Sequence, residues 1–172
     1  VKVNYTPPAL TATINQAVGQ VDPTNASPIN FTVVFNYPVS DFVTGDVALS
    51  GTAGATTATV TGSGTTYNVA VSGMTSNGTV IASLLPGVAT NVNGTLNSAS
   101  TSTDHTVIYD ATPPTATIDL QDTSDTGISI TDDLTNAAAP VFDVTFNEDV
   151  SAPVFGNFSN SGTATGCTFA VG

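Results

Sequence analysis

Ten of the thirteen acidic residues of this chain lie in one stretch, between Asp104 and Asp149. Carboxylates that are held close together repel one another unless a cation lies between them. Calcium is bound in proteins by hard oxygen ligands, which carboxylates, hydroxyls and backbone carbonyls supply. The clustering therefore predicts a structural Ca²⁺ site, and a solvated acidic loop is the alternative interpretation. The candidate ligands are Asp110, Asp122, Asp125, Asp132 and Asp133.

Other residues that could carry chemistry are few and isolated. His105 is the single histidine, and no Ser or Cys stands at a recognisable catalytic spacing from it. Cys167 is the single cysteine, so we expect it either to pair with a cysteine outside residues 1–172 or to be a small buried side chain. Glu148 and Asp149 are adjacent, and adjacent residues of a strand point to opposite faces. We therefore expect no catalytic site and no enzyme activity.

The charge balance excludes several classes of partner. Lys2 is the only basic residue apart from the histidine, and the formal net charge is −12. Such a chain cannot neutralise phosphates, so we expect no nucleic-acid partner and no anionic membrane surface. No apolar run reaches the roughly 18–20 residues of a membrane helix, so we expect no transmembrane segment. Hydrophobic residues make up 40% of the chain, enough for a packed core.

An internal repeat gives the strongest indication of how these residues are positioned. Thr11-Ala12-Thr13-Ile14 recurs 104 residues later as Thr115-Ala116-Thr117-Ile118. Phe31-Thr32-Val33-Val34-Phe35-Asn36 recurs 111 residues later as Phe142-Asp143-Val144-Thr145-Phe146-Asn147. The offset rises by seven between these two matches, so the second copy has a longer first loop, residues 119–133. This longer loop holds four of the five candidate calcium ligands.

The hydrophobic period is that of β-strands. Ile29, Phe31, Val33 and Phe35 alternate with polar or outward-facing residues, which predicts a strand with one buried face. Residues 67–71 show the same alternation, and 58–60, 80–82 and 107–109 continue it. Turn signals separate these segments, among them Gly62-Ser63-Gly64, Asn77-Gly78 and Asn93-Gly94. Several short strands with a turn every 8–12 residues or so predict an all-β sandwich.

The repeat also predicts the domain organisation. Residues 1–8 are expected to be the terminal strand and linker of a preceding module, and residues 9–110 to be a first immunoglobulin-like module. A proline-rich linker is expected at 111–114, where Thr112-Pro113-Pro114 recurs from Thr6-Pro7-Pro8. Residues 115–172 are expected to be the first part of a second module that is incomplete in this chain. The chain lacks an initial Met, and we expect it to be a window on a longer or processed protein.

The quoted segments resemble a known family. The first module carries TATINQAVGQVDPTNASPINFTVVF, then DVALSGTAGATTATVTGSGTTYNVAVSGM and STDHTVIYDATPP. These segments resemble the bacterial Ig-like tandem repeats (Bap-like) of large surface proteins and adhesins. The loop SDTGISITDDLTN is similar to calcium-binding loops of that family. The resemblance implies tandem immunoglobulin-like β-sandwich modules, an extracellular or cell-surface location, and calcium that rigidifies the junction between neighbouring modules.

Three functions follow as expectations. The first is a structural, secreted repeat module of a prokaryotic surface stalk, adhesin or filament, whose partners are neighbouring Ig-like modules of the same or another chain. The second is a self-assembling filament or surface-layer subunit, a homopolymer in which a strand of one chain completes the sandwich of another. The third is a carbohydrate-binding adhesive module, which needs an exposed aromatic platform.

Overall fold

The computed structural model describes residues 8–129, 131–159, 161, 168 and 170. The chain divides into two compact units, Val1–Thr112 and Pro113–Gly172, and the boundary falls inside the expected linker at 111–114. The described residues form strands in antiparallel sheets together with one short 3₁₀ helix, so this part of the chain is all-β.

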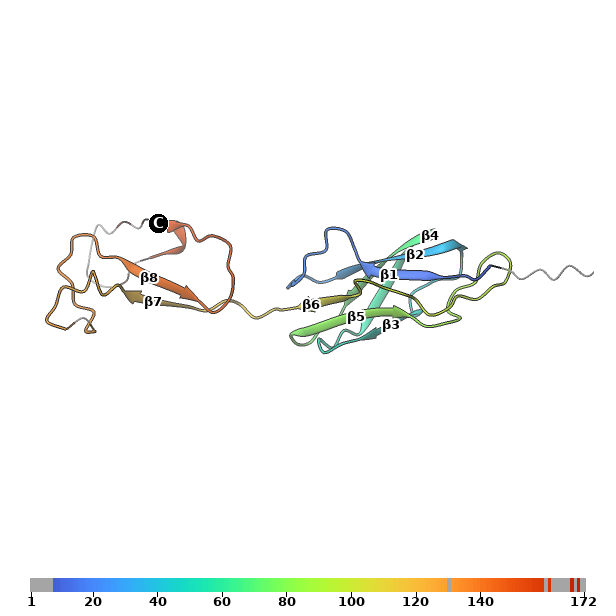
Figure 1. Cartoon of the computed structure of the whole chain (residues 1–172), viewed down its shortest axis with the longest axis horizontal. Helices are drawn as coiled ribbons and strands as arrows, with labels where there is room; N and C mark the ends of the chain where they lie inside the picture. The colour runs from blue at the N-terminus through green and yellow to red at the C-terminus, as the bar shows by residue number, and fades with distance from the viewer. Residues whose placement is uncertain (1–7, 130, 160, 162–167, 169, 171–172) are drawn as a thin grey trace, which may run out of the picture. The chain divides into compact units, whose positions relative to one another are not determined.

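The first unit contains two three-stranded sheets in two layers (Figure 1). One sheet has the order β1 (Ala12–Gln16), β2 (Ile29–Val39), β4 (Thr57–Ser72). The other has the order β3 (Val47–Ser50), β5 (Gly78–Leu84), β6 (Thr106–Tyr109). All neighbouring strands within these sheets are antiparallel.

The core of the first unit lies between the two layers. The alternation expected for residues 29–35 is confirmed, because Ile29, Phe31, Val33 and Phe35 are all buried. Tyr67, Val69 and Val71 of β4 are buried too, so the period of two holds across that layer. The second layer contributes the inward-facing apolar residues of β5 and β6, which are Val80, Ala82, Leu84 and Val107.

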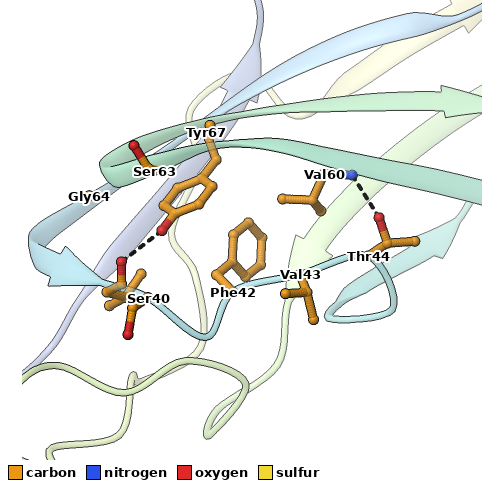
Figure 2. Close-up of a pocket in the computed structure, with 10 residues that line it drawn as sticks. Ser40, Phe42, Val43, Thr44, Val60, Ser63, Gly64 and Tyr67 are labelled. Atoms are coloured by element: carbon orange, nitrogen blue, oxygen red, sulfur yellow. Dashed lines mark hydrogen bonds between the residues drawn. The ribbon is translucent and has the colours of Figure 1, made fainter.

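Strand β4 is folded back on itself. The backbone N–H of Thr56 donates to the carbonyl of Ser72 at 3.1 Å, so the two ends of the element lie side by side. Figure 2 shows the chain reversing direction at Ser63 and Gly64. Gly62 and Gly64 have φ values of 120° and 71°, a left-handed conformation that glycine adopts without steric cost. The expected hairpin turn at residues 62–64 is therefore present.

The start of β1 is fastened to the end of β2 by one asparagine. The Asn36 backbone N–H donates to the Thr11 carbonyl at 3.1 Å, and its side-chain Oδ1 accepts from the Thr11 N–H at 2.9 Å. Its Nδ2 donates to the carbonyl of Ala9, also at 2.9 Å. Both the oxygen and the nitrogen of the side-chain amide therefore hold residues 9–11.

The second unit begins with the same strand pair. Strand β7 (Ala116–Leu120) pairs antiparallel with β8 (Phe142–Phe146), and the 3₁₀ helix η1 (Phe155–Asn157) follows. Ala12 pairs with Phe35 in the first unit, and Ala116 pairs with Phe146 in the second. These partners are related by the offsets of the sequence repeat, 104 for the first strand and 111 for the second.

The asparagine contact recurs with the strand pair. The Asn147 N–H donates to the Thr115 carbonyl at 3.2 Å, and its Oδ1 accepts from the Thr115 N–H at 2.7 Å. Asn147 and Thr115 stand at the repeat positions of Asn36 and Thr11. The two units therefore share strand register and a side-chain contact, as well as sequence.

Burial differs between the two copies. Phe31 is fully buried, whereas Phe142 at the same position of β8 is 51% exposed. Ile14 is fully buried, whereas Ile118 of β7 is 62% exposed. In the first unit the β3–β5–β6 layer covers this face, and the described part of the second unit contains no such layer.

Candidate functional site

The acidic loop of the second unit lies between β7 and β8, and its described residues are joined by several hydrogen bonds. Its first turn is closed by the Gln121 carbonyl, which accepts from the backbone N–H of Ser124 and of Asp125 at 2.7 and 3.0 Å. The Ser124 hydroxyl oxygen accepts from the N–H of Val141 at 2.9 Å. These bonds fix the turn against the start of β8 and place Asp125 in the interior of the loop.

The carboxylate of Asp125 is the buried acidic group of this loop. Its residue is 7% exposed, and Oδ1 accepts from the Gly127 N–H at 3.3 Å. Its other oxygen, Oδ2, is buried and has no hydrogen-bond partner. An unpartnered buried carboxylate oxygen costs free energy that a bound cation would recover. The unpartnered Oδ2 of Asp125 is therefore the observation that favours a cation in this loop.

A second carboxylate and a carbonyl approach Gly127 together with Asp125. A Cβ atom on Gly127 would lie 3.1 Å from Asp132 Oδ1, 3.4 Å from the Ser129 carbonyl and 3.5 Å from Asp125 Oδ1. The lack of a side chain at Gly127 therefore lets three oxygens lie close to one another. Oxygen-only ligation of this kind suits calcium, and water fills the rest of its coordination shell.

The other three candidate ligands lie elsewhere. Asp122 and Asp133 are exposed, and Asp133 has a left-handed φ of 56°. Asp110 belongs to the first unit, where its Oδ1 accepts from the Thr112 N–H at 3.0 Å and from Asn77 Nδ2. Among the described residues no three acidic, His or Cys side chains gather as a metal-binding group. The loop itself brings together Asp125 and Asp132, and calcium binding there remains a prediction.

A separate groove of about 600 Å³ lies on the first unit (Figure 2). It is lined by the end of β2, the 40–44 loop and the hairpin tip of β4, with Phe42, Val60 and Tyr67 in its wall. The Tyr67 hydroxyl donates to the Val39 carbonyl at 2.8 Å, and the Phe42 and Tyr67 rings pack edge to face at 5.1 Å. No motif in the sequence pointed to this groove, because its walls come from segments about twenty residues apart.

The groove has no arrangement that would activate a nucleophile. Ser40, Thr44 and Ser63 supply hydroxyls, but its lining residues include no histidine and no carboxylate. The Phe42 and Tyr67 rings are buried, so they do not form the open aromatic platform that a sugar-binding module needs. The groove is a packing feature at one end of the β1–β2–β4 layer.

His105, Glu148 and Asp149 are not among the residues that line the groove or surround Gly127. His105 directly precedes β6, and its carbonyl accepts from the Ala82 N–H at 3.4 Å. Strand β8 ends at Phe146, so Glu148 and Asp149 follow the strand rather than alternating along it, and the expectation based on strand faces is wrong for this pair. Glu148 Oε1 is buried without a hydrogen-bond partner. Cys167 lies outside the described residues.

The carboxylate of Asp41, next to a residue that lines the groove, has a lowered pKa. The Thr90 N–H donates to Asp41 Oδ1 at 2.9 Å, and this backbone hydrogen bond lowers the pKa of Asp41 below its ordinary value of 3.8. Burial of the neighbouring Tyr67 hydroxyl raises the pKa of that tyrosine, and the negative charge of Asp41 adds to the effect. The ionised form of Asp41 is thus the form that the fold favours.

We expect Asp41→Asn to reduce the stability of the first unit at neutral pH but not in strong acid. A depressed pKa contributes stability above the unfolded-state value, and this contribution is lost as the pH falls through the folded-state value. Urea unfolding at a series of pH values, followed by tyrosine fluorescence, measures the difference. The effect is small because Asp41 is exposed. Asp119→Asn, in β7, is the charge-matched control, and a difference that persisted below the ordinary pKa would contradict the assignment.

No protein-family model, no curated protein and no solved structure matches the chain. Within the described residues, no helix has the length and apolar character needed to cross a membrane.

Proposed function

We propose that this chain is a structural part of a secreted or cell-surface prokaryotic protein, built from Ig-like β-sandwich modules in tandem. Such modules give a stalk, adhesin or filament its length and reach. The proposal also assigns calcium a stiffening role, at the loop that holds Asp125 and Asp132. It supposes no catalysis.

One observation carries the proposal: the strand pairs β1–β2 and β7–β8 have the same register at the offsets of the sequence repeat. Two units that share strand register and the side-chain contact of Asn36 are what a duplicated module produces. The acidic, lysine-poor composition suits an exterior that stays soluble at high local concentration. The short segment with Pro113 and Pro114 suits a stiff connection, because proline fixes φ and restricts the preceding residue.

Completing the second unit tests the tandem-module proposal. Residue 172 aligns with residue 61 of the first unit, so we would append residues 62–110 after Gly172. We expect the added segment to cover the exposed face of β7 and β8, because it supplies the strands that bury Ile14 and Phe31 in the first unit. Amide hydrogen exchange in β7 and β8 should slow, and binding of a hydrophobic dye should fall.

The control is the same extension with Val69→Asp and Val80→Asp in the appended copy. Both side chains are fully buried in the first unit, so their charged replacements prevent packing. Protection of β7 and β8 that is equal in the two extended chains, or absent from both, would reject the tandem-module proposal.

A second function, assembly by strand donation between chains, is favoured by one observation. Ile118 and Phe142 present an apolar face of the β7–β8 pair to solvent. Exposed apolar surface of this kind is typical of sites that other chains cover. Sedimentation of the purified chain over a wide concentration range separates the two proposals. A monomer at every concentration would exclude self-assembly and leave the structural-module proposal intact.

A further inference from the structure

The side chain of Asn77 fastens the last residues of the first unit. Its Oδ1 accepts from the Ala111 N–H at 2.9 Å, and its Nδ2 donates to Thr112 Oγ1 and to Asp110 Oδ1. Asp110 Oδ1 also accepts from the Thr112 N–H at 3.0 Å. One exposed amide therefore ties residues 110–112, which we call the exit segment, to the loop between β4 and β5.

The residue after Asn77 has to be glycine. Gly78 has a φ of 150°, and a Cβ atom there would lie 2.2 Å from Thr52 Oγ1 and 2.8 Å from the Thr52 carbonyl carbon. The close approach of Thr52 thus excludes every other residue type. The fold consequently keeps an Asn-Gly step at this place, and Asn-Gly is the step at which an asparagine amide is most easily lost, because no side chain shields the glycine nitrogen.

The chain holds a second Asn-Gly step in a different setting. Asn93 and Gly94 lie in the turn between Asn91 and Thr95, and Gly94 has a φ of 77° with open space where a Cβ atom would stand. The Asn93 N–H donates to Asn91 Oδ1, and the Gly94 N–H donates to the Asn91 carbonyl at 2.9 Å. The side-chain amide of Asn93 is not tied as that of Asn77 is. The two steps therefore differ at the asparagine side chain, which is held at residue 77 and not at residue 93.

We propose that Asn77 is a modification site: a deamidation-sensitive latch that holds the exit segment while its amide is intact and releases it when the amide becomes a carboxylate. In the reaction, the Gly78 nitrogen attacks Asn77 Cγ, the bond from Cγ to Nδ2 breaks, and ammonia leaves. Water then opens the cyclic imide to aspartate or isoaspartate. One water is consumed, one ammonia is released, and nothing is oxidised or reduced.

The consequence of the reaction follows from the contacts. Nδ2 supplies the hydrogens that reach Thr112 Oγ1 and Asp110 Oδ1, and a carboxylate has none to donate. The new negative charge would instead face the carboxylate of Asp110, and like charges at hydrogen-bonding distance repel. The exit segment therefore loses the two contacts that Nδ2 donates and gains a repulsion from Asp110, while the carboxylate can still accept from the Ala111 N–H. In the intact latch the same contacts hold the amide in place and slow the attack of Gly78.

Peptide mapping by mass spectrometry during incubation at mildly alkaline pH tests the latch. The full chain is used, with a chelator present so that metal binding plays no part. We expect the Asn93 step to convert several-fold faster than the Asn77 step. In the double variant Asp110→Ala and Thr112→Val, the Asn77 step should accelerate to the rate of Asn93, while the Asn93 rate stays unchanged. Equal rates at the two steps in the unaltered chain would overturn the proposal.

Amide hydrogen exchange tests the release directly, without waiting for the reaction. Asn77→Asp should speed exchange at Ala111 and Thr112 several-fold, and Asn93→Asp should leave both unchanged. Exchange at Val80 in the core of β5 reports whether the variant is still folded. Unchanged exchange at both Ala111 and Thr112 in a folded Asn77→Asp chain would show that this asparagine is no latch.

Discussion

Phe31→Ala should lower the free energy of unfolding of the first unit by about 3–5 kcal/mol, the usual cost of deleting a large buried aromatic side chain. Phe31 is fully buried between the two layers, and its strand neighbours Val33 and Phe35 leave little room for collapse into the cavity. Urea unfolding followed by tyrosine fluorescence measures this loss, because all four tyrosines precede residue 113.

Phe142→Ala is the matched control, because Phe142 has the same place in β8 that Phe31 has in β2. It is 51% exposed, so we expect its loss to cost about 1 kcal/mol or less. Amide exchange in β7 and β8 reports this value. Equal losses of unfolding free energy in the two variants would contradict the difference in burial between Phe31 and Phe142. In the chain extended by residues 62–110, the cost of Phe142→Ala should rise toward that of Phe31→Ala.

Calcium should stabilise the second unit through the oxygens around Gly127. A ligand that binds only the native state at one hundred times its dissociation constant adds about 2.7 kcal/mol to the free energy of unfolding. Thermal melting monitored by circular dichroism, with calcium and with chelator, should therefore show a higher melting temperature for this unit with calcium. The first unit, whose tyrosine signal is separate, should be unaffected.

Variants locate the effect within the loop. Asp125→Asn should abolish the calcium-dependent shift, because it removes the charge of the carboxylate whose Oδ2 is buried without a partner. Asp122→Asn removes the same charge from an exposed position and should leave the shift in place. Gly127→Ala should weaken binding, since its Cβ would crowd Asp132 Oδ1 and the Ser129 carbonyl and push them from their present positions. A melting temperature that calcium does not change would remove the metal from the proposed function.

The strands were predictable because their signal is local. The alternation at residues 29–35 and the repeat at 142–146 depend only on which face of a strand is apolar, so β2 and β8 could be expected from the sequence. The exposure of Phe142 could not be predicted from its own segment. It depends on whether other strands cover β8, which the alternation within one strand does not encode.

The acidic loop was predictable as a region but not atom by atom. Five aspartates looked equivalent in the sequence, whereas the structure buries Asp125 and leaves Asp122, Asp132 and Asp133 exposed. The difference arises from the Ser124 hydroxyl and the Gln121 carbonyl, whose hydrogen bonds turn Asp125 inward. Asp110 looked near to the loop along the chain, but Asn77, thirty-three residues earlier, is its partner. Such long-range side-chain contacts leave no periodic trace in a sequence.

The asparagine at the end of β2 has a mechanical consequence. Asn36 grips residues 9 and 11 on the outer side of the first rung of the β1–β2 ladder, where Ala12 meets Phe35. Tension that enters the first unit ahead of residue 9 loads this amide before it loads any rung of the ladder. The Asn36 side chain therefore shares the first load on β1 with the bond from the Ser98 N–H to the Leu10 carbonyl, and the contact of Asn147 Oδ1 with the Thr115 N–H lies at the matching place before β7.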